Sequence, residues 1–455
     1  MGRFAWRLLA LISLNLVGLN LGAETRPHYG GTLRVEIHEA PTLTDPSEWP
    51  RELVPLVYDC LVRLDEQGEP RQALAISWQH DAESRIWEFH LRPGVKFHDG
   101  SPVNAAAAAA SLTAFGNVSA SEEGAVVFHS EHPEPELPAR LAGPGGVILR
   151  RGNDGMTTGT GPFRIAEWQP GRRAKLVAND EYWDGRPFLD AIDLQMFRTF
   201  REQSIDLELG RADVVELTVE DARREAQRDI RVWTSAPGEL LALLFDRRRA
   251  AVEDARMREA LALSIDRAAI QSVLLQKQGE STGALLPQWL TGYAFLFPAA
   301  RDVERARQMA SSLPRSSLRA SLGYDPADPL ARPIAERIAL NAGEAGIALQ
   351  VAPGRQSDLR LARLPLSSLD GGQALSDLAA ALGMSDLLKD PYRATPEGLY
   401  RAEGKLLESF QVIPLFHVPK ILGLGPRVRD WDPQRWSNWR LESTWLNIPP
   451  EPRAP

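Results

Sequence analysis

The sequence contains almost no cysteine: among 455 residues, Cys60 is the only one. A single thiol cannot form an internal disulfide, so a disulfide-stabilised fold is excluded and the chain must rely on its core. Hydrophobic residues make up 44% of the chain, which is enough to build such a core. Cys60 lies among apolar neighbours at residues 56–62, which favours a buried small hydrophobe over a reactive nucleophile.

The chain also lacks an excess of positive charge. It contains 52 Lys and Arg against 60 Asp and Glu, which gives a formal net charge of −8 at neutral pH. Nucleic acid selects a strongly basic face, so we exclude it as a partner. Beyond the N-terminus no apolar run is long enough to cross a bilayer, and no repeat has the period of a solenoid.

The N-terminus has the three-part layout of a secretory signal. Arg3 and Arg7 precede an apolar run at residues 8–21, and the small residues Gly22 and Ala23 follow. The run is short and interrupted by polar side chains, which disfavours the alternative of a membrane anchor. We expect residues 1–23 to be cleaved, leaving a periplasmic chain with 60 acidic and 50 basic residues and a net charge of −10. No cysteine lies near the cleavage point, so no lipid anchor is expected.

Strand and helix patterns alternate irregularly along the rest of the chain. Residues 32–37 alternate polar and apolar side chains as a half-buried strand does, and residues 163–178 read as a hairpin. A helix is expected over residues 51–64, and the apolar run at 240–245 reads as a buried strand before a helix capped by Asp254. This alternation favours the α/β class with mixed sheets over a barrel or a bundle.

Several segments resemble one known family along most of the chain. They are YGGTLRV at residues 29–35, LAISW at 74–78, WEFHLRPGVKFHDGSP at 87–102, GTGPFRI at 159–165, NDEYWDGRPFLD at 179–190, DARMREAL at 254–261, IDR at 265–267 and VIPLFH at 412–417. In this order they resemble the family 5 extracellular solute-binding proteins, the oligopeptide, dipeptide and nickel receptors of ABC importers. The motifs consist mostly of turn residues and core aromatics, so they indicate the fold more strongly than the ligand.

The resemblance implies a two-lobed periplasmic binding protein fold of type II with an inserted small domain. The ligand then sits in the cleft between the lobes, which close by a hinge motion. The expected parts are a discontinuous first lobe at residues 24–49, 159–244 and 396–455, a small domain at 50–158, and a second lobe at 245–395.

The chain departs from the family between residues 351 and 384, where it is abbreviated. We find no segment with the tryptophan and aspartate that, in peptide receptors, supply the carboxylate for the ligand's amino terminus. Residues 361–370 stand near the expected place but contain no tryptophan, and Asp370 is their only carboxylate. The role is therefore not transferred to Asp370.

Asp246 is a candidate ligand residue because it follows the apolar strand at 240–245, where many relatives have an asparagine beside the cleft. Its carboxylate would accept hydrogen bonds from an ammonium or hydroxyl group. The alternative is an ion pair with one of the arginines that follow it, Arg247, Arg248 or Arg249.

Five further candidates lie in two loops. His38, Glu39 and Trp49 follow the first strand, in a segment that borders the cleft in the resembling family. Trp289 and Tyr293 lie in the loop at residues 287–298, which glycine and proline punctuate. The aromatic rings suit stacking on a ligand, and the alternative for each is packing within its own lobe.

We predict neither a metal site nor a cofactor. His129 and His132 are three residues apart and flanked by glutamates, but they lie in a proline-rich stretch with no predicted helix. His98 belongs to the turn motif at residues 87–102 and reads as structural.

The predicted function is a monomeric periplasmic receptor that binds a small polar ligand, first of all a short peptide, and presents it to an ABC importer permease. One alternative is a ligand-sensing module without transport. Another is a periplasmic hydrolase, which is disfavoured because neither a phosphate-binding loop nor a Gly-x-Ser-x-Gly elbow is present. We therefore predict that the chain is not an enzyme.

Overall fold

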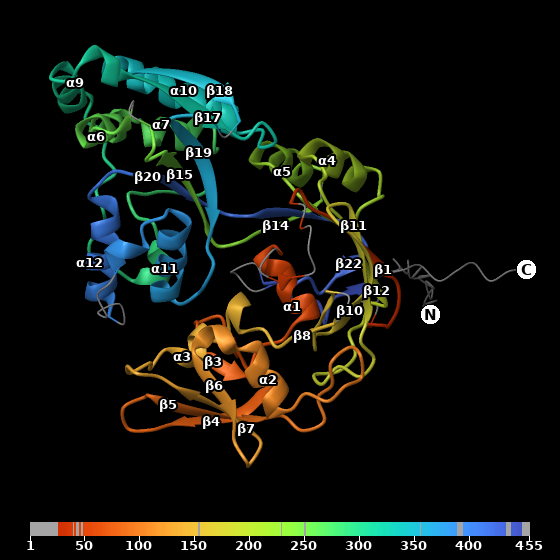
Figure 1. Ribbon diagram of the computed structural model, residues 1–455. Coiled ribbons are helices and arrows are strands. Elements are labelled where there is room, and N and C mark those ends of the chain that lie inside the picture. Colours follow the sequence, from red (N-terminus) through yellow and green to blue (C-terminus); the bar gives the residue numbers. More distant parts are fainter. Residues whose placement is uncertain are drawn as a thin grey trace, which may run out of the picture.

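The chain folds into three parts, each built on its own sheet (Figure 1). The computed structural model describes residues 26–39, 41, 45–46, 49–152, 155–228, 230–249, 252–354, 356–388, 395–433 and 438–447. The predicted signal at residues 1–23 lies outside these ranges. We call the part at the right of Figure 1 lobe I, the part at the upper left lobe II, and the part at the bottom the small domain.

Lobe I is built on a mixed sheet of seven strands. In spatial order they are β10 (Phe163–Gln169), β11 (Arg173–Ala178), β12 (Ala191–Gln195), β1 (Thr32–Glu36), β13 (Val214–Glu216), β21 (Ile421–Leu424) and β14 (Arg231–Thr234). Strand β1 pairs in parallel with both neighbours, while β10 and β11 form the predicted antiparallel hairpin. Helices α4 (Phe200–Glu208) and α5 (Val219–Ala226) and the short strands β8 (Arg150–Arg151), β9 (Thr157–Thr158), β22 (Val428–Arg429) and β23 (Trp445–Leu446) complete this region.

Lobe II has a six-stranded sheet with helices on both faces. The strands are β16 (Glu280–Ser281), β20 (Val412–Val418), β15 (Glu239–Phe245), β19 (Leu359–Pro365), β17 (Arg319–Tyr324) and β18 (Ala348–Pro353). One face packs against α6 (Ala255–Ser264), α7 (Arg267–Val273), α9 (Val303–Ser311) and α10 (Ala331–Glu344). The other packs against α8 (Gln288–Thr291), α11 (Gly371–Ala381) and α12 (Pro396–Leu407).

The apolar sequence of β15 explains its central place in this sheet. Alternate residues of a strand point to opposite faces, so an unbroken apolar run needs cover on both sides. On one face of β15, Leu241, Leu243 and Phe245 pack in the core beneath α6, α7, α9 and α10. On the other face, Leu240, Ala242 and Leu244 pack in the core beneath α8, α11 and α12. Strands β15 and β20 and helix α12 therefore belong to lobe II, whereas the sequence assigned residues 239–244 and 396–418 to the first lobe.

The small domain carries a four-stranded antiparallel sheet. Its elements are β2 (Val62–Leu64), β3 (Pro70–Gln72), β4 (Ala75–His80), β5 (Ile86–Leu91), β6 (Asn117–Ala120), β7 (Ala125–His129), α2 (Ala105–Ser111) and α3 (Leu137–Arg140). Short 3-10 turns lie at Arg51–Leu53, Thr113–Phe115, Pro144–Gly146, Arg315–Leu318 and Ser385–Leu388.

The helix predicted over residues 51–64 is much shorter in the structure. Helix α1 spans only Val54–Val57, because Tyr58 is extended and Cys60 forms a β-bridge with Val147. The side chains of residues 53–58 pack into the core of lobe I, and the core of the small domain begins only at Leu61. The expected boundary at residue 50 therefore lies about ten residues further along the chain.

The glycines of the 159–165 motif have a packing reason. A Cβ placed on Gly161 would lie 2.6 Å from the carbonyl carbon of Val57, and one on Gly159 would lie 2.0 Å from the Val57 oxygen. The Gly161 N–H donates to that same oxygen at 2.9 Å. Only a residue without a side chain lets the two backbones approach this closely.

Two neighbouring segments, residues 235–238 and 419–420, connect lobe I to lobe II. The Ser235 N–H donates to the Lys420 carbonyl at 3.0 Å, and the Lys420 N–H donates to Ser235 Oγ at 2.9 Å. We call these two segments the hinge. Within the described ranges, no helix is both long and apolar enough to cross a membrane.

Candidate functional site

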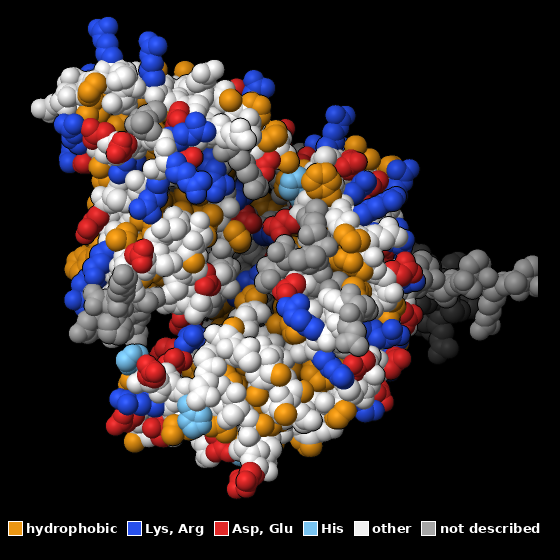
Figure 2. All heavy atoms as spheres, in the orientation of Figure 1, with side chains coloured by type: hydrophobic (Ala, Val, Ile, Leu, Met, Phe, Trp, Pro, Cys, Tyr) orange, Lys and Arg blue, Asp and Glu red, His pale blue; other side chains and the backbone are white. Residues whose placement is uncertain are grey.

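A cleft separates lobe II from the other two parts, and Figure 2 shows the molecule hollowed there. It encloses about 1800 Å³, including the solvent space at its mouth. All three parts contribute walls: Trp49 from lobe I, Phe115 from the small domain, and Trp289 from lobe II. Hinge residues, including Lys420, form its floor.

A second hollow of about 800 Å³ lies on the other side of the hinge, between the same two lobes. The two hollows share Glu39, Glu239 and Lys420. These three charged side chains therefore stand at the centre of the interlobe space.

Lys420 is buried in a network of carboxylates. Its ammonium pairs with Glu52 and with Glu216, the latter at 3.2 Å, and the lysine side chain is only 16% exposed. Burial alone would lower the pKa of Lys420, but the surrounding glutamates hold it well above its usual value. Lys420 is thus a permanently charged structural centre whose charge is already neutralised.

His38 lies beside this network and is fixed by it. Its backbone N–H donates to Glu216 Oε2 at 2.5 Å, and its ring stacks on Phe200 with 5.1 Å between ring centres. Nδ1 lies 3.1 Å from the Arg198 carbonyl oxygen. The ring therefore lines the second hollow rather than the main cleft.

Glu39 differs from Glu52 and Glu216, which pair with Lys420. Among the described residues, no side chain lies within ion-pair or hydrogen-bond distance of the Glu39 carboxylate. It lines both hollows. The Glu39 side chain is exposed within the two hollows. Partial desolvation by the surrounding walls raises its pKa to about 7, with Lys420 opposing the shift and Glu52, Glu216 and Glu239 adding to it. Such a carboxylate is suited to receive a cationic group from a ligand.

Arg51 is the cationic counterpart, placed just before α1. Its guanidinium donates to the Leu366 carbonyl of lobe II at 3.2 Å, and no described carboxylate lies within ion-pair distance. Burial lowers the pKa of Arg51 to about 10, with Glu52 opposing the shift. Among the described residues, the guanidinium has this carbonyl and no carboxylate as a partner, which suits a ligand carboxylate.

The two tryptophans predicted from the loops both line the cleft, in different ways. Trp49 is only 6% exposed and stacks on Trp168 with 5.4 Å between ring centres, so most of its surface serves packing in lobe I. Trp289 is half-buried and its Nε1 donates to the Pro237 carbonyl at 2.9 Å. That bond fastens a wall of lobe II to the hinge.

Tyr293 lies outside the cleft lining. It is 8% exposed within lobe II, and its hydroxyl donates to Glu403 at 2.8 Å. Glu403 also accepts the backbone N–H groups of Leu285 and Leu286. Tyr293 therefore fixes the loop that carries Trp289, which is the packing alternative.

Asp246 is also not brought to the cleft. It follows the end of β15 opposite to Glu239, and a seven-residue strand separates its ends by about 20 Å. Its carboxylate lies 3.6 Å from Arg249 and accepts the Arg248 N–H at 3.0 Å, as the ion-pair alternative proposed. The sequence located the strand but not which of its ends faces the cleft.

The sequence reasoning missed Arg51 and Lys420. Both had a signal: Arg51 follows Trp49-Pro50, and Lys420 interrupts two apolar strands directly after Pro419. Asp370, to which no ligand role was transferred, caps α11 by accepting the Gln373 N–H at 2.6 Å.

Three histidines considered in the sequence analysis do not line the cleft: His98, which was predicted to be structural, and His129 and His132, which were weighed as metal ligands. His98 is held by Nε2 at 3.0 Å from the Gly161 oxygen, and burial lowers its pKa to about 4. Across the part of the chain that the structure describes, no group of three or more His, Cys, Asp or Glu residues has the geometry to hold a metal ion.

Residues 69–373 match the model of the bacterial extracellular solute-binding proteins, family 5. The chain is 23% identical to the oligopeptide-binding protein AppA of Bacillus subtilis over 292 residues, 56% of this chain and 53% of the relative. It is 23% identical to the nickel-binding periplasmic protein of Escherichia coli over 350 residues, 67% of each chain. The aligned region thus spans about half the length of the first relative.

Solved structures match over almost the whole chain. The Bacillus subtilis AppA complex with a nonapeptide superimposes with a TM-score of 0.79 at 18% identity, covering 93% of this chain and 100% of that one. A Staphylococcus aureus NikA complex with Ni(L-His)2 gives a TM-score of 0.80 at 17% identity, covering 91% and 99%. These likenesses confirm the predicted α/β binding-protein fold with mixed sheets.

Proposed function

Since the chain belongs to the bacterial extracellular solute-binding proteins of family 5, we propose that it is a periplasmic receptor that delivers a short peptide to an ABC importer. Members of this family are non-catalytic binding proteins. The proposed receptor works as a monomer whose lobes close over the ligand by bending at the hinge.

The observation that carries the proposal is the pairing of Glu39 with Arg51 in one cleft. Each has a charge without an ionic partner among the described side chains, and the two charges are opposite. A peptide is a zwitterion whose ammonium would meet Glu39 and whose carboxylate would meet Arg51. A neutral sugar would leave the partly buried guanidinium uncompensated when the lobes close over it, which is costly.

Isothermal titration of the purified protein with peptides of two to nine residues tests this proposal. We expect free peptides to bind, and we expect either an acetylated amino end or an amidated carboxyl end to weaken binding at least about tenfold, since each modification removes one charge pair. Failure of every peptide to bind, or equal binding of free and blocked peptides, would overturn it.

The proposal also predicts a pH dependence. With the pKa of Glu39 near 7, binding of an ammonium requires Glu39 to lose its proton, so affinity falls as the pH drops through 7. We expect peptide affinity to rise about tenfold between pH 5.5 and 7, where the peptide amine stays charged. Titration calorimetry measures the profile, and Glu39→Gln should bind weakly and give a flat one. A steep profile in that variant would assign the titration to another group.

A further inference from the structure

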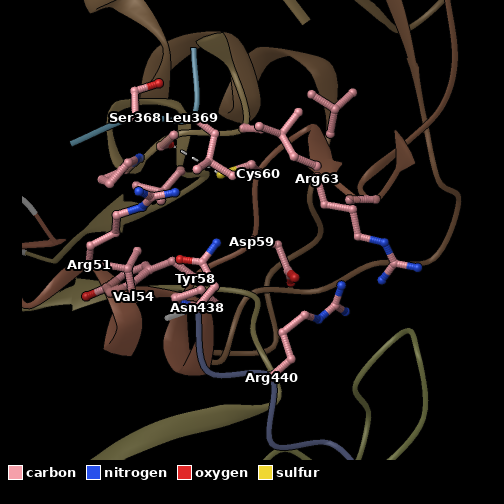
Figure 3. A pocket seen from close by; sticks show the side chains of 18 of the residues that line it. Arg51, Val54, Tyr58, Asp59, Cys60, Arg63, Ser368, Leu369, Asn438 and Arg440 are labelled. Atoms are coloured by element: carbon pink, nitrogen blue, oxygen red, sulfur yellow. Dashed lines mark hydrogen bonds between the residues drawn. The ribbon is translucent and has the colours of Figure 1, made fainter. Parts of the chain in front are cut away.

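A side chamber opens where lobe I, the small domain and lobe II meet, and Figure 3 looks into it. It holds about 840 Å³, including the open space at its mouth. Arg51 enters it from one side, while Arg63 and Arg440 lie on the opposite side (Figure 3). The role of this chamber is not explained by the contacts described so far.

Apolar side chains form part of the wall between these arginines. These small and aliphatic side chains come from α1, β2, the small domain and lobe II: Val54, Val62, Ala139, Ala142, Val147 and Leu369. This part of the wall suits a hydrocarbon or aromatic group.

The other charged groups of the chamber already have ionic or hydrogen-bond partners. Arg63 lies 3.2 Å from Asp184, and Arg440 lies 3.1 Å from Glu442. Asp59 accepts hydrogen bonds from Thr160, Tyr182 and Trp183 at 2.9–3.1 Å. Arg51 is therefore the chamber's cation without a carboxylate partner among the described residues, and it is the same cation that serves the cleft.

The chamber and the cleft adjoin. Arg51, Gly143, Pro144 and Ser368 line both. A ligand whose carboxylate reaches Arg51 from the cleft thus has the chamber directly beside that carboxylate. In a peptide, the group beside the carboxylate is the side chain of the last residue.

We propose that the chamber binds the side chain of the ligand's carboxyl-terminal residue and selects a large apolar one. This inference rests on the proposed function and adds the class of peptide. Ser368 and Leu369, which border the chamber, come from lobe II, whereas most of the remaining lining comes from lobe I and the small domain. A side chain in the chamber therefore contacts both sides of the hinge and favours the closed arrangement.

The test compares matched peptides by titration calorimetry: Gly-Phe, Gly-Gly-Phe and Gly-Gly-Gly-Phe, each against the peptide with glycine in place of Phe. Burial of an aromatic side chain predicts at least about tenfold tighter binding of the Phe-ended member at the length that binds best. The variant Ala142→Leu fills the chamber and should reduce this ratio to near one while leaving the affinity for the Gly-ended peptide within about threefold. Leu369→Ala, on the lobe II side, should also lower the ratio.

Ala110→Leu is the matched control, because Ala110 lies exposed on α2 of the same domain and outside the chamber. It should keep the wild-type ratio. Equal binding of both members of each pair by the wild type, or an unchanged ratio in Ala142→Leu, would overturn the chamber while leaving the peptide function standing. Absence of binding by all six peptides would overturn the chamber, and the peptide function would fall with it only if the peptides of five to nine residues also failed to bind.

Discussion

Replacing Lys420 with methionine should lower the free energy of unfolding by about 3–5 kcal/mol, because it leaves buried carboxylates without their cation. Glu52 and Glu216 have side chains only 10% and 9% exposed, and both pair with this ammonium. Methionine preserves the length and apolar stem of the lysine, so little of the loss would come from packing. Urea unfolding monitored by circular dichroism measures the change.

A control variant separates the loss of the buried charge from other causes. Lys96→Met is the control: Lys96 also pairs with a glutamate, Glu181, at 3.0 Å, but the two side chains are 47% and 69% exposed. Its effect should stay below about 1 kcal/mol. Equal losses in both variants would contradict the assignment of a buried network.

The secondary structure was predictable wherever the apolar residues followed one clear strand or helix periodicity. The hairpin predicted at residues 163–178 became β10 and β11, and Asp254 caps α6 as expected. The helix predicted at 51–64 failed because its apolar residues serve two different cores, and periodicity cannot tell which core a side chain enters. The motifs predicted the family, and the match to residues 69–373 confirms it.

The residues that line the cleft were less predictable than the fold. Position after the first strand was enough to place Glu39 and Trp49 at the cleft, since loops that follow strands border clefts. The sequence could not show that Asp246 lies at the far end of β15, because strand direction relative to a cleft is a tertiary property. Arg51 was missed for a similar reason: its contact with the Leu366 carbonyl exists only in the folded chain, where residues 365–368 of lobe II line the same cleft.

Arg51→Gln should weaken peptide binding about 100-fold or more. Removing one partner of a desolvated charge pair costs about 2–5 kcal/mol, much of it from stranding the other charge, here the peptide carboxylate. Stability should change little, because the partly buried guanidinium has no carboxylate partner among the described residues. Titration calorimetry with a peptide that binds the wild type measures the loss.

Arg140→Gln provides the control, since Arg140 lines the same cleft but already pairs with Glu134 at 2.6 Å. Its affinity should stay within about threefold of the wild type, because that charge is already compensated before the ligand arrives. A carboxyl-amidated peptide completes a double-mutant cycle: it should bind the wild type and Arg51→Gln almost equally, since the two changes remove the same pair. If Arg51→Gln instead weakened the free and the amidated peptide by the same factor, Arg51 would shape the cleft through Leu366 without meeting the carboxylate. The chamber would then have to bind the ligand's last side chain without Arg51 holding the neighbouring carboxylate.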